Sequence, residues 1–427
     1  MRVQPVAGDI PSLIPFGSAD HKKPANTPRF ADNGRHDAPG AGQSEETIDF
    51  VEVREGVLSI PSSNGHEHGA LRSTQFQEKG WLEAWQGLIG EELGSKPFTA
   101  IGYSAGKPVF ILPLTVIRRY GSRVLTWSAY QQSDYNAPVV STAHAAALAN
   151  LDGGDILRDI ARRVGKIDLV YMPKQPRFVG GIANPFLLPG AVPYHAGAHA
   201  INFLPGETWE AAFRRRRSAK TRRRLREKRL ALEKAGTVSL RIAATQSEAK
   251  GLIGLCLDAK SRQLQKLGHW DPFADLAVRE FVISVFSNGA DRSTWVAALD
   301  AGDGPAAVAF GFRNSSEWLL YQMAMTGETD PRHSPGTHLL IELMSKCSEL
   351  GVRRLDLALG DEPYKAEWCD EHHVLETSTL AFTARGWLLQ TMIRFRAMAR
   401  SRLAADPRLY ERAKWLKGIA RKFRLPF

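Results

Sequence analysis

A turn of small residues opens a helical pattern in the second half of the sequence. Residues 332–337 include serine, proline, glycine and threonine, and residues 337–350 carry apolar side chains at helical spacing. The first N–H groups of a helix have no partner within it and the helix dipole is positive there, so such a start can bind phosphate. Helix starts with glycine are common, however, and spacing alone favours an ordinary strand–turn–helix unit.

A polar cluster follows the next strand pattern, at residues 353–359. Directly after this strand come two carboxylates, a tyrosine and a lysine: Asp361, Glu362, Tyr364, Lys365. Carboxylates can accept a proton from a substrate and tyrosine can donate one. A charged surface turn would look similar, but sites in α/β proteins form at strand ends, and the crowding here favours function. Asp356 lies inside the strand, so its carboxylate needs a partner if buried, with Arg353 or Lys365 as candidates.

The elements that must position these two groups are predicted by periodicity. Three alternating runs with turn-like connectors, residues 293–299, 306–313 and 318–325, predict a three-stranded meander. Two helical patterns precede it, at residues 246–267 and 273–287. The order is therefore two helices, three strands, the small-residue turn, a helix and a strand.

This order resembles the core of the GNAT acyltransferases. The sequence motifs resemble those of one branch of that superfamily, the cellulose-biosynthesis-type (CelD/BcsL-like) acetyltransferases, which are related to the Fem-type peptidyl transferases. The resemblance is carried by Ser334-Pro335-Gly336, Leu355-Asp356-Leu357, Gly360-Asp361-Glu362-Pro363-Tyr364-Lys365 and Trp368. It is fairly specific over residues 205–385 and weaker over 70–200. The common GNAT signature has Gln or Arg followed by two residues, a glycine, one residue and a small residue. Here Arg332 stands four positions before Gly336, and His338 replaces the second small residue.

The resemblance implies a mixed α/β fold of two tandem GNAT-like halves, in the arrangement of the Fem proteins. It implies acetyl-CoA or another acyl-CoA as co-substrate, with the pyrophosphate held by the N–H groups of Ser334, Gly336 and Thr337, and no metal. The activity that it implies is direct transfer of the acyl group to an amine or hydroxyl of a sugar, a polysaccharide precursor or a similar acceptor.

The resemblance also implies roles for the polar cluster. Asp361 or Glu362 would act as the base, and Tyr364 as the acid for the departing thiolate. Lys365 would bind an anionic part of the substrate, with Trp368 beside it. Two alternatives remain: an aminoacyl-tRNA-dependent Fem-type transferase, and a non-catalytic module of an envelope polysaccharide system.

The first half of the chain repeats the meander in a weaker form. Strand patterns at residues 98–103, 109–117 and 124–127 follow a helical pattern at 75–93. A polar cluster comes next: Asp134, Tyr135, Asn136. Asp and Asn before a proline are turn formers, whereas the family resemblance implies acceptor recognition, and the two interpretations are evenly balanced. Further along, a helix is predicted at residues 154–164 and a strand at 167–172, with short strands up to 205.

A dense basic run lies in a predicted helix over residues 208–234. Arg214–Arg229 contains eleven Lys or Arg and one acid, whereas the chain outside this run and the basic tail is mildly acidic. Like charges at helical spacing repel, so an anionic partner or an acidic patch of the body should compensate. Stacking aromatics are absent from the run, so tRNA is a less favoured partner than an anionic substrate, carrier or membrane surface.

Length and composition set the remaining expectations. The 427 residues predict two domains: a first half at 46–200 and a second half at 201–385, flanked by a disordered segment at 1–45 and a basic helical tail at 386–427. The tail is expected to pack on the second half, with a membrane surface as the alternative.

The cysteines and histidines predict neither disulfides nor a metal site. The three cysteines are expected to be reduced core residues. His66-Glu67-His68 fits a solvated loop, and Gly197 between His195 and His199 argues against a helix that would join them as ligands. The sequence has no apolar run long enough to cross a bilayer and no signal peptide pattern. The expected location is cytoplasmic, with the inner membrane face as a peripheral alternative.

Overall fold

The computed structural model describes residues 47–57, 71–234, 236–288, 293–302, 304–327 and 329–405. The segment 1–45, predicted to be disordered, lies outside the described residues, as do His66-Glu67-His68 and the end of the basic tail.

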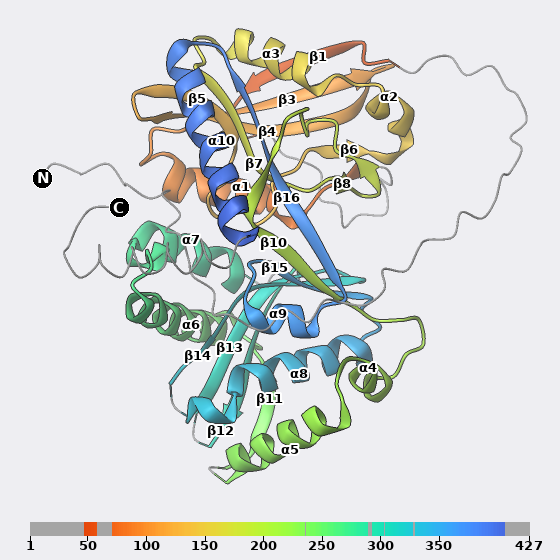
Figure 1. The fold of residues 1–427 in the computed structure, drawn as a ribbon, viewed down its shortest axis with the longest axis vertical. Coiled ribbons are helices and arrows are strands. Elements are labelled where there is room, and N and C mark those ends of the chain that lie inside the picture. Colours follow the sequence, from red (N-terminus) through yellow and green to blue (C-terminus); the bar gives the residue numbers. More distant parts are fainter. Residues whose placement is uncertain are drawn as a thin grey trace, which may run out of the picture.

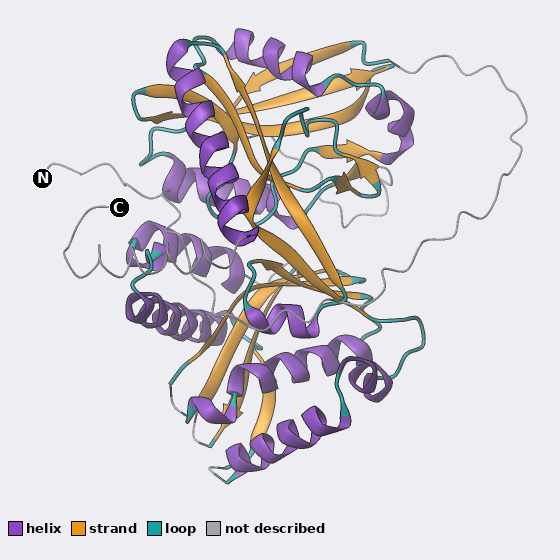
Figure 2. Cartoon of the chain, in the orientation of Figure 1, coloured by secondary structure: helices purple, strands orange, loops and turns teal. Residues whose placement is uncertain are grey.

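Within the described residues, one mixed sheet of fourteen strands runs through the molecule, and helices pack on it along its length (Figures 1 and 2). The main path of the sheet has the order β1-β3-β4-β5-β7-β16-β10-β15-β14-β13-β12-β11. The strands of the first half are β1 (Phe50–Glu55), β2 (Leu71–Arg72), β3 (Lys96–Ser104), β4 (Lys107–Arg119), β5 (Ser122–Trp127), β6 (Val139–Ser141) and β7 (Leu169–Gln175). Those of the second half are β11 (Val238–Ile242), β12 (Thr294–Ala301), β13 (Gly304–Arg313), β14 (Glu317–Met325) and β15 (Arg354–Leu359).

The two ends of the sheet share one plan. In the first half, β3, β4 and β5 form an antiparallel meander, and β7 pairs with β5 in parallel. In the second half, β12, β13 and β14 form the same meander, and β15 pairs with β14 in parallel. The predicted mixed α/β fold of two tandem halves is thereby confirmed.

The two halves exchange their last strands at the centre of the sheet. β10 (Val192–Asn202) follows β7 along the chain but pairs with β15 of the second half. β16 (Glu371–Ala381) follows β15 but pairs with β7 of the first half. The two exchanged strands also pair with each other. Only short strands were predicted between residues 173 and 205, and this is wrong for the long central β10. Its neighbours come from distant sequence, which local patterns do not encode.

Helices before and after each meander pack around the sheet. They are α1 (Lys79–Trp85), α2 (Ala145–Ala149), α3 (Gly153–Val164), α6 (Gln246–Leu267), α7 (Leu276–Ser287), α8 (Pro335–Glu349) and α9 (Pro363–Trp368). The side chains of Thr245 and Asp275 accept backbone N–H bonds at the starts of α6 and α7, which fixes where both helices begin. The helices predicted at residues 246–267, 273–287 and 337–350 are present as α6, α7 and α8.

Two predicted helices are interrupted. The pattern at 75–93 forms a 3₁₀ turn, then α1, then a π-helical turn at Gln86–Gly90, because Glu78 is extended. The basic run forms α4 (Trp209–Arg216) and α5 (Ala219–Glu233), not one helix. The break lies at Arg217 and Ser218, where the Ser218 hydroxyl accepts a bond from the Thr221 amide and starts α5.

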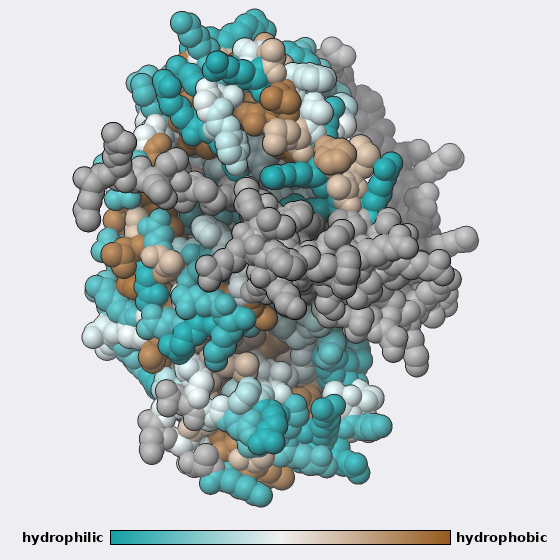
Figure 3. All heavy atoms as spheres, turned by 60° about the vertical axis from the view of Figure 1, so that its left-hand side comes forward, coloured by the Kyte–Doolittle hydropathy of each residue, from teal (hydrophilic) through white to brown (hydrophobic). Residues whose placement is uncertain are grey.

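The C-terminal helix α10 (Ala384–Ala405) packs against β7, β10 and β16. Leu389 and Ile393 join the core of the first half, so the expectation that the tail packs on the second half is wrong for its described part. The reason is the strand exchange, since β16 leads the chain back to the first half. Trp387, Leu388 and Phe395 stay exposed on α10. Figure 3 shows apolar residues in small groups between hydrophilic ones on the described part of one face.

A shared aromatic core joins the two halves. Trp81 of α1 lies 4.6 Å from Phe281 of α7 and 5.7 Å from Tyr321 of β14, measured between ring centroids. Trp81 is 2% exposed, and its indole N–H donates to the Ser133 hydroxyl at 2.9 Å. Cys256 and Cys347 are buried free thiols, as predicted. Among the described helices, none combines the length and apolarity that a membrane span requires.

Removing this aromatic contact should destabilise both halves together. We expect Trp81→Ala to lower the free energy of unfolding by roughly 3–5 kcal/mol, because it opens a cavity in the shared core. Denaturant unfolding followed by fluorescence and circular dichroism measures the change, and Trp387→Ala on the exposed face of α10 is the control. A loss confined to one of two separate transitions would contradict a shared core.

Candidate functional site

The strands β14 and β15 are paired only near their starts. Their partners in the parallel ladder are Glu317 with Arg354, Trp318 with Leu355, and Leu319 with Asp356, after which the strands diverge. Ala358 has φ 55° near the end of β15, and Gly360 has φ 130° just beyond it. The pairing of β5 and β7 in the first half is equally short. Divergence leaves strand edges whose backbone groups can meet a ligand or another segment.

A loop of the first half, residues 128–138, approaches the divergence of β14 and β15. The Tyr135 hydroxyl donates to Asp356 Oδ1 at 2.7 Å, and the Tyr321 hydroxyl donates to the Gln132 carbonyl at 3.0 Å. From α1, the indole N–H of Trp85 donates to Gln132 Oε1 at 2.8 Å. Tertiary folding thus brings Asp134 beside the strand end that carries Asp361–Lys365.

Burial makes the Asp134 carboxyl a weaker acid than usual. Desolvation raises its pKa to about 6, and the nearby charges of Lys174 and Lys365 oppose that rise. A hydrogen bond from the backbone of Leu359 also favours the ionised form. A carboxylate with this pKa is ionised near neutral pH and basic enough to accept a proton from a substrate.

Two buried lysines hold the loop and the strand end. Lys174 Nζ donates to the carbonyls of Gln131 at 3.1 Å and Ser133 at 2.8 Å. Lys365 Nζ donates to the Leu359 carbonyl at 2.9 Å and lies 3.0 Å from Glu362 Oε2. Both ammonium groups therefore have protein partners, which buried charges require.

The partner of the buried Asp356 is Arg354. Arg354 Nη1 lies 2.9 Å from Asp356 Oδ2, so neither Arg353 nor Lys365 makes the expected pair. The amide of Ala358 donates to Asp356 at 2.6 Å. Burial raises the pKa of Tyr135 well above its ordinary value, and the adjacent Asp356 adds to the effect, so Tyr135 stays protonated and donates.

Tyr135 and Asn136 hold the loop in place through their own contacts. The Asn136 side-chain amide donates to the Pro173 carbonyl at 3.1 Å, and its backbone N–H donates to the Lys174 carbonyl at 3.0 Å. These contacts give both residues a structural role in the loop, and acceptor recognition by them stays a prediction.

Asp361 lies in a cluster that the sequence did not reveal. Its Oδ1 is 3.0 Å from His199 Nε2, 4.0 Å from His372 Nε2, and accepts the Gly197 amide at 3.1 Å. Burial by itself would raise the pKa of Asp361, but the bonds from His199 and Gly197 outweigh it and leave the pKa below its ordinary value. The alternating pattern of β10 gives a local signal for His199, whereas no local pattern joins it to Asp361.

The amino end of α8 carries the predicted phosphate-binding residues. Ser334 has φ 56° and precedes the helix, and Lys228 Nζ of α5 lies 2.7 Å from its hydroxyl. A Cβ on Gly336 would meet only Met325 Cγ at 3.5 Å, an ordinary contact, so the packing tolerates a small side chain. The Ser334 amide already donates to the Pro331 carbonyl at 3.0 Å, so its predicted role as a phosphate donor is not supported. The Gly336 and Thr337 amides belong to the first turn of α8, where N–H groups have no partner within the helix, and they stay the predicted donors beside the Lys228 ammonium.

Tyr364 and Trp368 are enclosed by the protein. Burial raises the pKa of Tyr364 far above its ordinary value, and Glu362 adds to the rise, so the phenol stays protonated. Trp368 is 2% exposed, and the Arg217 guanidinium lies 3.8 Å from its ring centroid. Trp368 thus packs in the core of the second half, and direct contact of its ring with a substrate stays a prediction.

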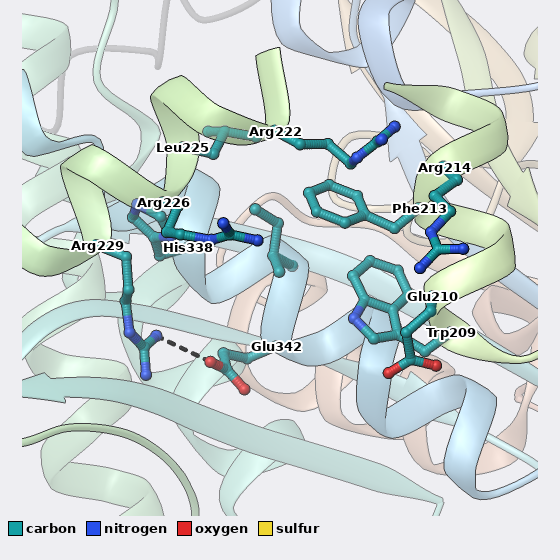
Figure 4. Close-up of a pocket in the computed structure, with 11 residues that line it drawn as sticks. Trp209, Glu210, Phe213, Arg214, Arg222, Leu225, Arg226, Arg229, His338 and Glu342 are labelled. Carbon is teal, nitrogen blue, oxygen red and sulfur yellow. Dashed lines mark hydrogen bonds and ion pairs between the residues drawn. The ribbon is translucent and has the colours of Figure 1, made fainter. Parts of the chain in front are cut away.

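A cavity of about 460 Å³ lies between α4, α5 and α8, beside the amino end of α8 (Figure 4). Its lining combines aromatic rings with several arginines: Trp209, Glu210, Phe213, Arg214, Arg222, Leu225, Arg226, Arg229, His338, Ile341, Glu342. Arg229 pairs with Glu342 at 2.8 Å, as the dashed line in Figure 4 marks. Burial lowers the pKa of His338 to about 4, helped by Arg229, so the imidazole is neutral.

The body of the protein neutralises part of the basic run. Arg215 and Arg216 pair with Asp370 at 3.2 and 2.5 Å, and Arg217 pairs with Glu367 at 3.2 Å. The sequence predicted that either an anionic partner or an acidic patch of the body would offset the repulsion within the basic run, and these pairs are the second of the two. Within the cavity, Arg229 pairs with Glu342 and Arg222 donates to the Arg217 carbonyl, which adds to this compensation.

A second cavity, of about 370 Å³, lies at the divergence of β5 and β7 in the first half. Four cations from three parts of the chain line it, and its lining has no carboxylate: Arg119, Lys174, Arg396, Arg400. Tyr130, Tyr171, Tyr194 and Trp270 supply aromatic surface. Lys174 connects this cavity to Asp134.

Comparison with known protein families finds a similarity in the second half of the chain. Residues 219–366 match the family model of the acetyltransferase (GNAT) domain. No curated protein sequence matches the chain. Among solved structures, FemX has 10% sequence identity and a TM-score of 0.52, over 77% of this chain and 96% of FemX.

Two further structures share the superfamily by description. A tandem GNAT protein from the clavulanic acid biosynthesis pathway has 12% identity and a TM-score of 0.37, over 78% of this chain and all of that one. A GCN5-related N-acetyltransferase from Sphaerobacter thermophilus has 12% identity and a TM-score of 0.37, over 79% of this chain and 98% of that one. These scores are too low to add to the argument, whereas the likeness to FemX shows the fold. Residues 219–366 are therefore similar to the acetyltransferase (GNAT) domain, and the whole chain has a fold of two GNAT-like halves similar to that of FemX.

Proposed function

We propose that the protein is an acyl-CoA-dependent acyltransferase that moves an acyl group, with acetyl as the first choice, to an amine or hydroxyl of a sugar-type acceptor. The observation that carries the proposal is the placement of Asp134 and Lys365 at the divergence of β14 and β15, in a region similar to the GNAT domain in which α8 follows β14 along the chain. In this proposal, the base lies at the gap between β14 and β15, and the amino end of α8 binds the phosphate.

The donor would bind along α8. In our proposal its pyrophosphate meets the N–H groups of Gly336 and Thr337, together with the Ser334 hydroxyl and the Lys228 ammonium that contacts it. The cavity between α4, α5 and α8 begins one helical turn further along and would take the nucleotide end of the donor. Its arginines suit phosphate groups, and its aromatic rings offer faces for an adenine.

The acyl group would lie in the divergence of β14 and β15. The acceptor nitrogen or oxygen attacks the thioester carbon, its proton passes to Asp134, and the carbon–sulfur bond breaks to release the thiolate. Tyr364, which burial keeps protonated, is the proposed proton donor to that thiolate. Asp361 and Glu362 were the bases predicted from sequence. Their contacts with His199 and Lys365 support positioning roles next to Asp134.

The acceptor would enter from the second cavity. Its four cations, its aromatic surface and its lack of carboxylates favour an acceptor with a negative group and a ring face, such as a phosphorylated or acidic sugar. Assignment to the cellulose-biosynthesis branch is part of this proposal and is supported by the motif residues alone.

A second candidate function is aminoacyl transfer from tRNA, as in Fem-type enzymes. The fold similarity to FemX and the arginines of α5 favour it. A thermal-shift screen with acetyl-, succinyl- and long-chain acyl-CoA beside tRNA separates the two functions. Stabilisation by an acyl-CoA supports the first, and stabilisation by tRNA alone overturns it.

The phosphate site is tested at Gly336. We expect Gly336→Asp to weaken acyl-CoA binding by more than roughly 10-fold, or about 1.4 kcal/mol, because a carboxylate there repels phosphate. Gly336→Ala is the control, since its methyl group meets only Met325 and should leave binding much less affected. Isothermal titration calorimetry on folded variants gives both affinities. Equal affinities for the wild type and the Asp variant would place the phosphate elsewhere.

The base is tested through pH. Transfer needs ionised Asp134, so kcat/KM should rise with pH through an apparent pKa near 6 and then level. Asp134→Asn should lower kcat by roughly 10²–10⁴-fold and abolish that acid limb, because the amide cannot accept the proton. Rate profiles with saturating donor measure this. Retention of the limb near pH 6 in the Asn variant would show that another group is the base.

The role of α5 is tested by paired charge reversals. Arg226 lines the cavity, whereas the Arg223 side chain is 78% exposed and pairs with Glu227 on the outer face of α5. We expect Arg226→Glu to weaken acyl-CoA binding by roughly 10-fold or more, and Arg223→Glu to change it little. Added salt should weaken wild-type binding. Loss of tRNA retention and activity in Arg226→Glu, in a protein that never binds acyl-CoA, would favour the Fem-type reaction.

A further inference from the structure

Two histidines and an aspartate meet on three neighbouring strands at the centre of the sheet. His199 lies on β10, His372 faces it directly on β16, and Asp361 follows the end of β15. The ring centroids of the two histidines are 4.7 Å apart. One ligand atom from each of the three residues lies within 4.8 Å of the other two.

Irregular strand pairing builds this cluster. The ladder between β10 and β16 shifts its register between Pro193 and Gly197, and the ladder between β10 and β15 shifts next to it. The Gly197 amide donates to Asp361 Oδ1, and the Gly197 carbonyl accepts the Gly360 amide at 2.9 Å. A Cβ on Gly197 would lie 2.3 Å from His372 Nε2, so only glycine leaves room for that ring. The backbone therefore fixes the carboxylate and makes space for the imidazole.

We propose that His199, Asp361 and His372 bind one divalent transition-metal ion of the zinc class. Bonds of about 2.1 Å in a tetrahedral site place ligand atoms about 3.4 Å apart. The observed separations of 3.0 Å from His199 Nε2 to Asp361 Oδ1, and 4.0 Å from His372 Nε2 to the same oxygen, lie on either side of that value. Two imidazoles and a carboxylate form a donor set suited to zinc and iron.

The surroundings provide both an anchor and an entry path. The His199 side chain is 8% exposed, whereas those of Asp361 and His372 are 40% and 52% exposed, so water can reach the ion and complete its coordination. A simple His–Asp hydrogen bond accounts for His199 and Asp361, but it leaves unexplained the second imidazole opposite them and the glycine that makes room for it.

The ion would fasten the exchanged strands. β10 comes from the first half of the chain, and β15 and β16 come from the second half, so one ion would link the two halves where they cross. The metal-binding test needs no substrate, so its outcome does not depend on whether the proposed acyl transfer is correct.

Metal binding is tested on the untagged full chain after treatment with a chelator. Zn²⁺ is titrated by calorimetry, and Co²⁺ is titrated by its visible absorption, which reports the coordination. We expect one ion per chain on this cluster, and more than roughly 10-fold weaker binding in His372→Ala and in Asp361→Asn. His373→Ala is the matched control, because that neighbouring side chain contacts Glu371 outside the cluster. It should bind as the wild type does.

Thermal unfolding provides an independent readout. Zn²⁺ should raise the midpoint of the wild type and of His373→Ala, but not that of His372→Ala, because an ion that binds the folded state stabilises it. Circular dichroism verifies that each variant is folded. The same affinity and the same midpoint shift in His372→Ala as in the wild type would overturn the proposal, as would a folded wild type that binds neither ion.

Discussion

The exchange of β10 and β16 is the constraint on which the rest of the structure depends. Each strand closes the sheet of the opposite half, so fourteen strands form one hydrogen-bonded surface. Neither half can satisfy its inner strand edge alone, because the N–H and C=O groups there need partners. The exchange also directs α10 back to the first half and sets β10, β15 and β16 side by side. The two histidines and Asp361 meet there for that reason.

Charge burial is the second organising feature. Asp134, Asp356, Lys174, Lys365 and Arg354 come together between a first-half loop and a second-half strand end, and each ionic group has polar partners. Removing one of them would leave another charge buried without a counterpart, which is more costly than losing an exposed pair. The same arrangement perturbs the acidity of one carboxyl and keeps two tyrosines protonated. Structural pairing and proposed catalysis thus depend on the same contacts.

The basic run shows how one segment can serve two purposes. Arginines at the end of α4 and just after it pair with Asp370 and Glu367 and pack on Trp368, which attaches the segment to the body. Those of α5 that face α8 surround a cavity, with Lys228 at the start of that helix. The charge density that would destabilise an isolated helix is therefore partly neutralised inside the protein. Four arginines of the run line the cavity, where a phosphate-bearing ligand would add to the compensation.

The sequence by itself determined the elements of each meander, the helix α8 and its small-residue turn, because these follow from local periodicity and turn chemistry. It also determined the order of elements, from which the GNAT-like fold could be predicted. Only the tertiary structure decided that β10 is a long central strand and that Asp134 lies beside Lys365. Tertiary folding also brings His199 next to Asp361 and His372. These features depend on pairings between segments up to more than two hundred residues apart, and the periodicity of one strand carries no information about which distant strand lies next to it.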